Sequence, residues 1–299
     1  MALACLGLSV LVFGVVPILL KYFTGHIDGW TANGVRYGVS ALLWLPFVLR
    51  NRQNVPAARN PWRDALVPSA INIAGQCTWG WSPYFNDASV LGFITRSSFL
   101  FAIVFGFWVL RAERPLAHRP GFWLGVAGTG AGVILMYAGG VGRGSTTPAG
   151  LLLLLLTSAA WGGYAVTVGK YMQGYSVRLA FGIVSIYTTA GLLPLMFLFG
   201  DTRQLGGLDS MQWIMLVVSG WLGVALGHIL IFRVIQGLGP IVLNAGQSVT
   251  PFATALLALA FLGERLSMTQ WIGGSVLIGS CMLVLQAKVR TGDARLDDA

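Results

Sequence analysis

Long apolar stretches separated by short polar connections make up most of this chain. Each stretch is about 20 residues long, the length that an α-helix needs to cross the hydrocarbon core of a bilayer. The pattern predicts helices over residues 3–23, 31–50, 65–85, 90–110, 119–139, 149–172, 177–199, 211–232, 240–262 and 268–287. The connections leave no room for a soluble domain. We therefore predict an all-α integral membrane protein with ten transmembrane helices.

Two of these stretches share one plan of polar and apolar positions. Residues 95–114 (TRSSFLFAIVFGFWVLRAER) align without a gap on residues 246–265 (GQSVTPFATALLALAFLGER). Each begins with polar residues, continues as an apolar run and ends in Glu-Arg. Self-similarity at a spacing of about half the chain indicates a duplicated membrane unit.

The duplication extends beyond this pair of helices. Leu45-Pro46 in the second predicted helix corresponds to Leu193-Pro194 in the seventh, 148 residues later. Five helices per copy is an odd number, so the second copy would enter the membrane upside down. We predict an inverted five-plus-five repeat, with copies at residues 1–140 and 141–287 and a polar cytoplasmic tail at 288–299.

Composition and charge support a membrane protein and set its orientation. Hydrophobic residues make up 56% of the chain and charged residues 10%, against about 25% charged in soluble domains. The net charge of +9 does not indicate nucleic-acid binding here, because the basic residues gather at helix ends. With a cytoplasmic N-terminus, thirteen Lys and Arg residues lie on inner segments and four on outer ones. We predict a bacterial-type inner membrane protein with both termini cytoplasmic. Its expected partners are lipid and a small-molecule substrate.

Cysteine and glycine positions bear on metals and on oligomeric state. The scattered Cys5, Cys77 and Cys281 indicate neither a disulfide framework nor a metal site, and no motif implies a cofactor. The fifth predicted helix carries small residues at spacings that allow close helix packing, at Gly121, Gly125, Gly128 and Gly132. We interpret this face as a contact within the monomer rather than as a dimer seam, so we favour a monomer.

The third predicted helix carries the strongest candidate site. Asn72, Gln76, Trp79 and Pro83 follow the helical spacing i, i+4, i+7, i+11 and share one face. Polar groups are costly in lipid, so this face should meet the bundle interior or a water-filled cavity. Two amides beside an indole suit a small polar substrate with a ring. The alternative is that the amides join helices and that the indole packs in the core.

A second candidate face lies on the ninth predicted helix. Asn244, Gln247, Ser248 and Pro251 share one side, and a helix broken near Pro251 would leave backbone groups free for a ligand. Pro17, Pro83 and Pro251 are hinge candidates, although a proline within a membrane helix is often a fixed kink.

Two aromatic residues of the sixth predicted helix complete the cavity candidates. Trp161 and Tyr164 are i, i+3 neighbours, and Trp161 lies well inside its helix, which argues against an interfacial anchor. They either line a cavity or pack in the core.

Two ionisable residues within predicted helices are candidates for function. Arg96 could bind a substrate carboxylate, pair with another helix or extend its head to the interface. His228 is the histidine inside a predicted helix and could carry protons, or it could be structural.

All ten acidic residues lie in connections, at helix ends or in the tail. Proton-driven carriers usually relay protons through acidic or histidine side chains within the membrane. We therefore predict facilitated movement of substrate, or weak coupling through His228. The sequence also lacks the motifs of intramembrane proteases, so we predict that the protein is not an enzyme.

The stretch SVTPFATALLALAFLGERLSMTQWIG and its weaker copy around Ser97–Trp123 resemble the repeated EamA unit of the drug/metabolite transporter superfamily. Trp161-Gly162 and Lys170 fit the same pattern, and the resemblance covers residues 3–287. The first copy departs from it, because Leu100 stands where the second has Pro251, so the two halves need not bend alike.

Within the superfamily the chain is most similar to bacterial aromatic amino-acid exporters of the YddG type. That resemblance implies ten helices, a central cavity and export of aromatic amino acids across the inner membrane. Our hypothesis for the mechanism is alternating access, in which the two halves rock around the cavity. The alternatives are an exporter of other hydrophobic metabolites or drugs and, less favoured, a passive channel.

Overall fold

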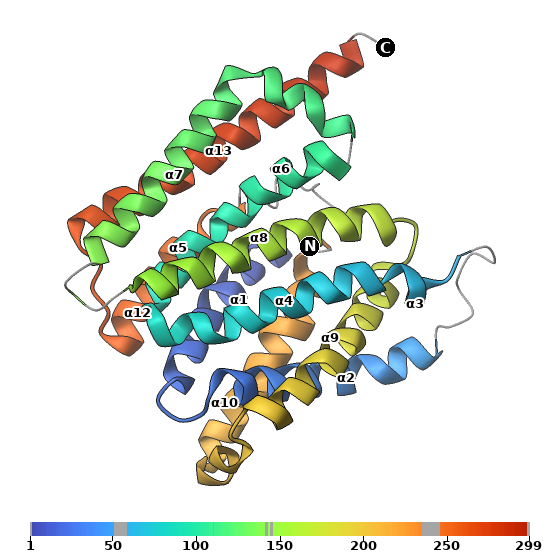
Figure 1. Cartoon of the computed structure of the whole chain (residues 1–299), viewed down its shortest axis with the longest axis vertical. Helices are drawn as coiled ribbons and strands as arrows, with labels where there is room; N and C mark the ends of the chain where they lie inside the picture. The colour runs from blue at the N-terminus through green and yellow to red at the C-terminus, as the bar shows by residue number, and fades with distance from the viewer. Residues whose placement is uncertain are drawn as a thin grey trace.

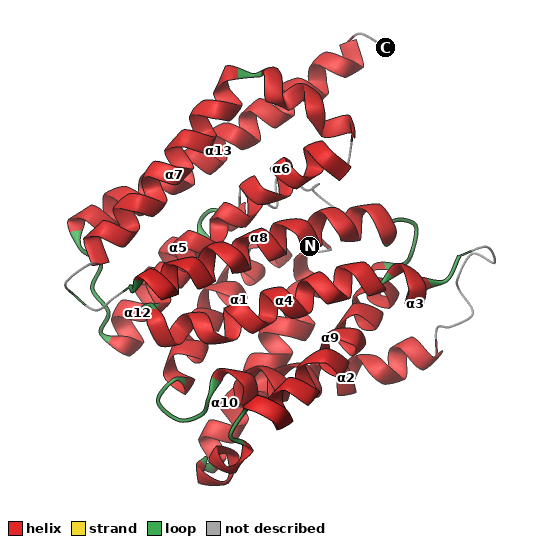
Figure 2. Cartoon of the chain, viewed as in Figure 1, coloured by secondary structure: helices red, strands yellow, loops and turns green. Residues whose placement is uncertain are grey.

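The computed structural model describes residues 2–50, 59–109, 111–140, 143, 146–231, 233–234 and 246–297. Over these ranges the regular secondary structure is helical, with one isolated β-bridge between Asn86 and Thr146 (Figure 2). The predicted all-α fold is confirmed for this part of the chain.

Where the connections are described, short segments join successive helices (Figure 1). The first half contains α1 (Ala2–Phe23), α2 (Gly29–Arg50), α3 (Pro61–Asp64), α4 (Leu66–Phe85), α5 (Ala88–Ile94), the 3-10 turn η1 (Thr95–Ser97), α6 (Ser98–Val109), the 3-10 segment η2 (Arg111–His118) and α7 (Pro120–Gly140). The second contains α8 (Pro148–Tyr171), α9 (Val177–Phe199), the 3-10 segment η3 (Thr202–Gly207), α10 (Ser210–Gly220), the π-helical turn η4 (Trp221–Leu226), α12 (Thr250–Leu262) and α13 (Met268–Asp297). Most predicted bounds agree to within a few residues, and α13 continues into the predicted tail. The predicted helix 90–110 is divided by η1, and the predicted helix 211–232 contains the π-helical turn η4. Of the predicted helix 240–262, residues 240–245 lie outside the described residues and α12 begins at Thr250.

Within the described ranges, seven helices are long and apolar enough to cross a membrane. They are Ala2–Phe23, Ala88–Val109, Pro120–Gly140, Pro148–Tyr171, Val177–Phe199, Ser210–Ile231 and Met268–Val289. Helices α2 and α4 are as long, with 22 and 20 residues, but carry more polar side chains. The chain is a multi-pass membrane protein, and ten crossings remain a prediction.

Helices α7 and α13 pack along each other through the glycine face of α7 (Figure 1). A Cβ atom added at Gly132 would lie 2.6 Å from the backbone nitrogen of Leu277, and one at Gly125 would lie 2.3 Å from a methyl carbon of Val284. Glycine is needed at both positions because the backbones approach so closely. The order of these contacts shows that the two helices run antiparallel. The glycine face packs within the chain, as predicted, while the monomeric state stays a prediction.

Helices α2 and α9 form a second long pair. A Cβ atom at Gly34 would lie 2.5 Å from Met196 Sδ, and one at Gly182 would lie 2.5 Å from a methyl carbon of Val48. The start of each helix therefore meets the end of the other, so this pair is also antiparallel.

Both halves have an interrupted helix at the positions that the sequence aligns. In the second half a turn at Ser248–Val249 precedes α12, which begins at Thr250 with Pro251 in its first turn. In the first half η1 separates α5 from α6 without any proline. The Thr95 hydroxyl donates to the Leu91 carbonyl (2.7 Å), and side-chain bonds of this kind often bend helices.

The Leu-Gly-Glu-Arg element has a clear structural basis at the end of α12. Gly263 adopts a left-handed conformation (φ +67°), which glycine tolerates and which ends the helix. The Glu264 amide then donates to the Ala258 carbonyl (3.2 Å). The turn directs the Glu264 side chain towards α5.

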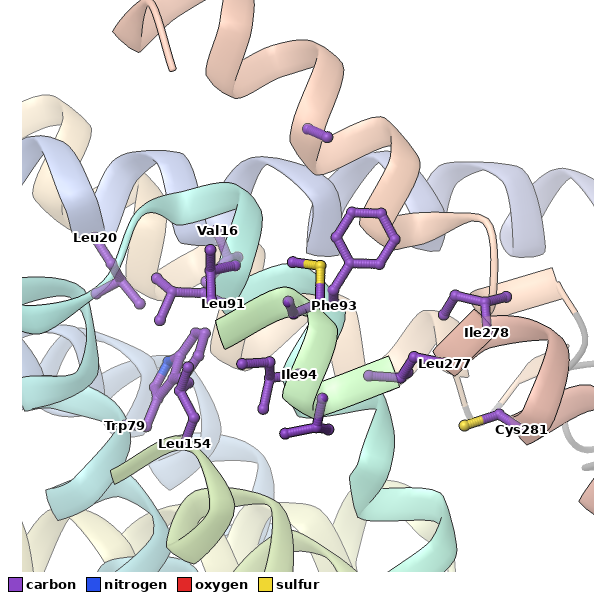
Figure 3. Close-up of a cluster of buried hydrophobic side chains, with 14 residues drawn as sticks. Val16, Leu20, Trp79, Leu91, Phe93, Ile94, Leu154, Leu277, Ile278 and Cys281 are labelled. Atoms are coloured by element: carbon purple, nitrogen blue, oxygen red, sulfur yellow. The ribbon is translucent and has the colours of Figure 1, made fainter. Parts of the chain in front are cut away.

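A hydrophobic cluster packs α5 against its neighbours (Figure 3). Leu91 and Ile94 of α5 lie among Val16 of α1, Leu154 of α8 and Leu277 of α13, and all but Val16 are fully buried. Trp79 of α4 extends the cluster. This packing fixes the segment that leads into η1.

Candidate functional site

A cavity of about 280 Å³ lies where helices of both halves meet. We call it the central cavity. Its lining comes from α1, α2, α4, the α5–η1–α6 segment, α8, η4 with the helical residues after it, and α12 with the residues before it. The lining residues are Phe13, Val16, Pro17, Arg36, Tyr37, Asn72, Gln76, Trp79, Gly92, Thr95, Arg96, Ser98, Trp161, Tyr164, Gly223, Val224, His228, Ile231, Gln247, Thr250 and Thr254. An apolar surface with a few polar groups is typical of a site for a small organic molecule.

Two indoles from different helices form an aromatic wall of this cavity. The ring centroids of Trp79 on α4 and Trp161 on α8 are 5.1 Å apart, with 53° between the ring planes. The helices approach closely here because Gly75 carries no side chain: a Cβ atom there would lie 3.1 Å from the Trp161 ring. Tyr164, one turn along α8, also lines the cavity. The structure thus brings together the predicted aromatic residues of the third and sixth predicted helices.

The two amides of α4 differ in their bonding. Asn72 Nδ2 donates to Thr188 Oγ1 of α9 (3.0 Å), so this amide joins two helices, as one of the two interpretations proposed. The Gln76 side chain makes no hydrogen bond to any residue that the structure describes, although it lines the cavity and is 8% exposed. Gln76 is therefore the amide of this face whose donors and acceptor remain available to a ligand.

On the α12 side, Gln247 is held in place by its neighbours. Its Nε2 donates to Ser9 Oγ of α1 (2.7 Å), and its Oε1 accepts from Thr250 Oγ1 (2.8 Å). Ser248 lines an adjacent pocket rather than the central cavity. Asn244, the fourth predicted residue of this face, lies outside the described residues.

Arg96 lies in η1 and lines the cavity, and it forms no ion pair with any residue that the structure describes. Its Nε atom is buried and has no hydrogen-bond partner in the described part of the chain. The ion pair found among the described residues is elsewhere, between Arg59 and Asp64. Of the three alternatives for Arg96, pairing with another helix thus receives no support from these contacts.

Sequence analysis did not select Arg36 and Tyr37, which lie in the middle of α2 and line the cavity. Arg36 Nε donates to Ser219 Oγ (3.1 Å) and Nη1 donates to Asn33 Oδ1 (3.2 Å). The side chain is 2% exposed. The signal was present in the sequence, because a charged residue within a long apolar stretch is itself a mark of function.

His228 lines the cavity from the helix that follows η4. Its ring stacks on Phe181, with centroids 4.3 Å apart, and its Nδ1 lies 2.9 Å from the Val224 carbonyl oxygen. A carbonyl only accepts, so Nδ1 carries a hydrogen and the neutral ring keeps Nε2 free of one. These contacts fit a structural histidine, and its role in coupling stays a prediction.

The π-helical turn η4 contributes Gly223 and Val224 to the cavity wall. Such turns are uncommon in proteins as a whole, and those that do occur are often found at functional sites. A Cβ atom at Gly223 would lie 2.8 Å from a methyl carbon of Val16 and 3.2 Å from Arg36 Nη2. The glycine therefore leaves space for the Arg36 head.

A second pocket of about 520 Å³ adjoins the central cavity, and we call it the Lys288 pocket. The two share Arg96, Ser98, Trp161 and Gln247. From there the Lys288 pocket follows α6 and reaches Gly169 and Lys288, near the carboxyl ends of α8 and α13. The cavity region thus extends towards this end of the bundle.

At the other end of the α5–α6 segment, polar contacts tie the chain together at the α4–α5 corner (residues 83–89). Lys21 Nζ donates to the carbonyls of Pro83 and Asn86, both at 2.9 Å. Glu264 accepts from the Ala88 amide (2.8 Å) and from the Ser89 amide (3.0 Å). A carboxylate is favourable at the positive end of a helix, so Glu264 joins the second half of the chain to the start of α5.

Asp87 is the residue of this corner whose ionised side chain is destabilised by its surroundings. Burial, and then the neighbouring Glu264 carboxylate, raise the pKa of Asp87 to about 6, while Lys21 opposes the shift. The ionised form of Asp87 is thus disfavoured while the corner is closed.

The hinge candidates lie in different environments. Pro17 is within α1 and lines the central cavity, and Pro83 is within α4 at the corner that Lys21 holds. Pro251 follows the break before α12. Whether any of them moves remains a prediction.

Comparison with known proteins bears on the identity of the chain. The sequence model of the EamA-like transporter family matches residues 1–138 and again residues 148–286. The chain belongs to the EamA-like transporter family. Its similarity to exporters of aromatic amino acids in particular stays a proposal.

Individual relatives agree with this membership. An uncharacterized inner membrane transporter, YedA of Escherichia coli strain K12, is 24% identical over 270 residues, which cover 85% of this chain and 81% of YedA. An uncharacterized transporter of Haemophilus influenzae is 33% identical over 107 residues, or 35% of each protein. A solved crystal structure superimposes with a TM-score of 0.65 over 95% of this chain and 96% of its own, at 13% identity, and thus shares the fold.

Family membership places the cavity in a transporter of the membrane. The described residues contain no group of three or more His, Cys, Asp or Glu side chains that could hold a metal ion. The aromatic wall, the Gln76 amide and the two arginines are groups that the cavity presents to a small molecule.

Proposed function

We propose that this EamA-family protein exports small amphipathic metabolites, with aromatic amino acids as the first candidates, by alternating access through the central cavity. The observation that carries the proposal is the Trp79–Trp161 wall beside the unbonded Gln76 amide. Indoles offer a large apolar face to a ring, and the amide offers a donor and an acceptor to a polar group. Arg96 supplies a charge for a carboxylate.

Two features of the fold support an inverted repeat of residues 1–140 and 141–287. The equivalent fifth helices of the two copies, α7 and α13, are antiparallel, and so are the equivalent second helices, α2 and α9. Copies with the same orientation would place equivalent helices parallel. Ten crossings with an odd number per copy would produce this inversion.

The asymmetry between the two ends of the cavity supports alternating access. Lys21 and Glu264 bind backbone groups at the α4–α5 corner. At the other end, Lys170, which the repeat aligns near Lys21, lies 5.3 Å from the ring centroid of Tyr171 and donates to no carbonyl of a described residue. Side-chain hydrogen bonds therefore hold the cavity end at the α4–α5 corner together, while the Lys288 pocket adjoins the cavity at the opposite end.

The charge distribution supports an inner membrane location with both termini in the cytoplasm. In that orientation the α4–α5 corner is the outer end and the Lys288 pocket is the inner end. YedA, a relative over most of this chain, is an inner membrane transporter. The structure would then be a state that takes up substrate from the cytoplasm, as an exporter requires.

No acidic side chain is among the described residues that line the central cavity. We therefore propose movement of substrate down its own gradient, with His228 as the histidine among the described lining residues that could carry protons through the cavity. A flux that follows a pH gradient and persists in His228→Ala would contradict this part of the proposal.

Flux measurements in liposomes test the proposal. We expect uptake of labelled phenylalanine or tryptophan to saturate, and to accelerate when unlabelled substrate is placed on the far side. A linear flux without acceleration would instead support a passive channel. Saturable flux of other hydrophobic metabolites, with none for aromatic amino acids, would support the second candidate substrate class.

A further inference from the structure

The charged side chains that line the central cavity are all positive among the described residues. Arg36 and Arg96 line it, while no Asp or Glu is among its described lining residues. Among the residues that the structure describes, the positive charge in this cavity therefore has no acidic partner.

Arg96 is the less satisfied of the two arginines. Its guanidinium makes no hydrogen bond to a described residue, and its Nε atom is buried. Burying an unpaired charge is expensive, and intramembrane charges usually pair or face a ligand pathway. An anion in the cavity would supply the missing acceptors.

Arg36 is positioned for the same task. Ser219 and Asn33 hold two of its donors, and both of these partners are neutral, so they orient the guanidinium without cancelling its charge. Its Nη2 faces the space that Gly223 leaves open. A guanidinium with a planar fork of donors is well suited to bind a carboxylate.

We infer that the central cavity selects organic anions: an aromatic or apolar carboxylate without a charged amino group binds better than the corresponding amino acid. This inference rests on the proposed function, in which the cavity is the transport site. An amino acid would bring its ammonium group next to two guanidinium groups, with no carboxylate among the described lining residues. A simple carboxylate brings the matching charge and leaves its ring to Trp79 and Trp161.

Three ligands with the same ring test this selectivity: 3-phenylpropionate, phenylalanine and phenethylamine. We would measure their equilibrium binding to the purified protein in lipid nanodiscs at pH 7, where they carry one negative, zero net and one positive charge. We expect 3-phenylpropionate to bind at least about tenfold more tightly than phenylalanine, and phenethylamine not to compete. Equal or tighter binding of phenylalanine or phenethylamine, or no binding of 3-phenylpropionate, would overturn the inference.

Arginine variants link the selectivity to the cavity. Arg96→Gln and Arg36→Gln should each weaken 3-phenylpropionate binding about tenfold or more, and Arg96→Lys should restore part of the loss at Arg96 because it restores the charge. Arg119→Gln, at an exposed position outside both pockets, should bind as the parent does. Unchanged binding in folded Arg96→Gln and Arg36→Gln proteins would overturn the assignment.

Binding and flux separate this inference from the function on which it rests. Tight, arginine-dependent binding of 3-phenylpropionate with no flux of any ligand would refute the carrier and leave the selectivity standing. Saturable phenylalanine flux, with no tighter binding of 3-phenylpropionate than of phenylalanine, would support the carrier and refute the selectivity.

Discussion

Trp79 lines the central cavity and also belongs to the hydrophobic cluster around α5. Substitutions at this position should show whether its indole contributes to substrate binding. The side chain is 5% exposed and contacts Trp161. We expect Trp79→Phe, which keeps an aromatic face, to retain most transport. Trp79→Ala should raise the substrate concentration for half-maximal flux about tenfold, because an aromatic pair contributes about 0.5–1.5 kcal/mol beyond its buried area.

Liposome flux at several substrate concentrations measures this effect. Trp213→Ala, at a residue that lines neither pocket, is the matched control. Wild-type kinetics in a folded Trp79→Ala protein would remove the indole from the site.

Gln76 and Gln247 both line the cavity, yet only one of them is bonded through its side chain within the described structure. Gln76→Leu should therefore lower transport about tenfold while the unfolding temperature stays near that of the parent. Gln247→Leu removes bonds to Ser9 and Thr250, so it should lower the unfolding temperature, since each net hydrogen bond contributes about 1 kcal/mol and the orphaned partners cost more. We would measure thermal unfolding in detergent and flux in liposomes for both variants. If the two variants changed flux and unfolding temperature alike, the assignment of Gln76 to substrate binding and Gln247 to stability would be refuted.

Helix packing can be tested with two glycines of α7. Gly132→Ala would place a Cβ atom 2.6 Å from the backbone of α13, whereas a Cβ atom at Gly130 has nothing within 4 Å. We expect Gly132→Ala to destabilise the fold by about 1–3 kcal/mol, as overpacking does, and Gly130→Ala to be neutral or slightly stabilising. Equal unfolding temperatures for the two variants would show that α7 and α13 do not pack in this way.

Most helix bounds could be predicted from the sequence, because the length of an apolar stretch and the spacing of its glycines can be read within one segment of the chain. Most helices begin and end close to the predicted positions, and the turn before α12 lies next to Pro251, where the sequence analysis considered a broken helix. The predicted helix 240–262 is the exception, because α12 begins at Thr250. The first-half break was less visible, since η1 depends on hydroxyl bonds to the backbone rather than on a proline. The bonding of Asn72 to Thr188 could not be predicted either, because the two residues lie 116 positions apart.

For the whole molecule, the closed α4–α5 corner should respond to pH. The raised pKa of Asp87, about 6, means that closure disfavours its ionised form. The penalty on the closed corner is therefore present above pH 6, falls as the pH drops through 6 and is gone below the ordinary carboxyl range near pH 4. We expect the corner to be more protected at pH 5 than at pH 7.5.

Hydrogen exchange of the Ala88–Leu91 amides, corrected for the intrinsic pH dependence of exchange, measures this protection. Asp87→Asn should remain protected at both pH values, because it cannot ionise. Greater protection at pH 7.5 than at pH 5 in the parent protein would contradict the assigned role of Asp87.

The central claim is that one cavity opens to one side at a time, and the sidedness of Ser98 tests it most directly. Ser98 lines both the central cavity and the Lys288 pocket. We would replace Cys5, Cys77 and Cys281, introduce Ser98→Cys, and apply a membrane-impermeant thiol reagent to vesicles of either orientation. The account predicts rapid modification from the side of Lys288, slow modification from the side of Glu264, and a shift of this ratio when transported substrate is added. Equally rapid modification from both sides, unaffected by substrate, would indicate an open pore and contradict alternating access.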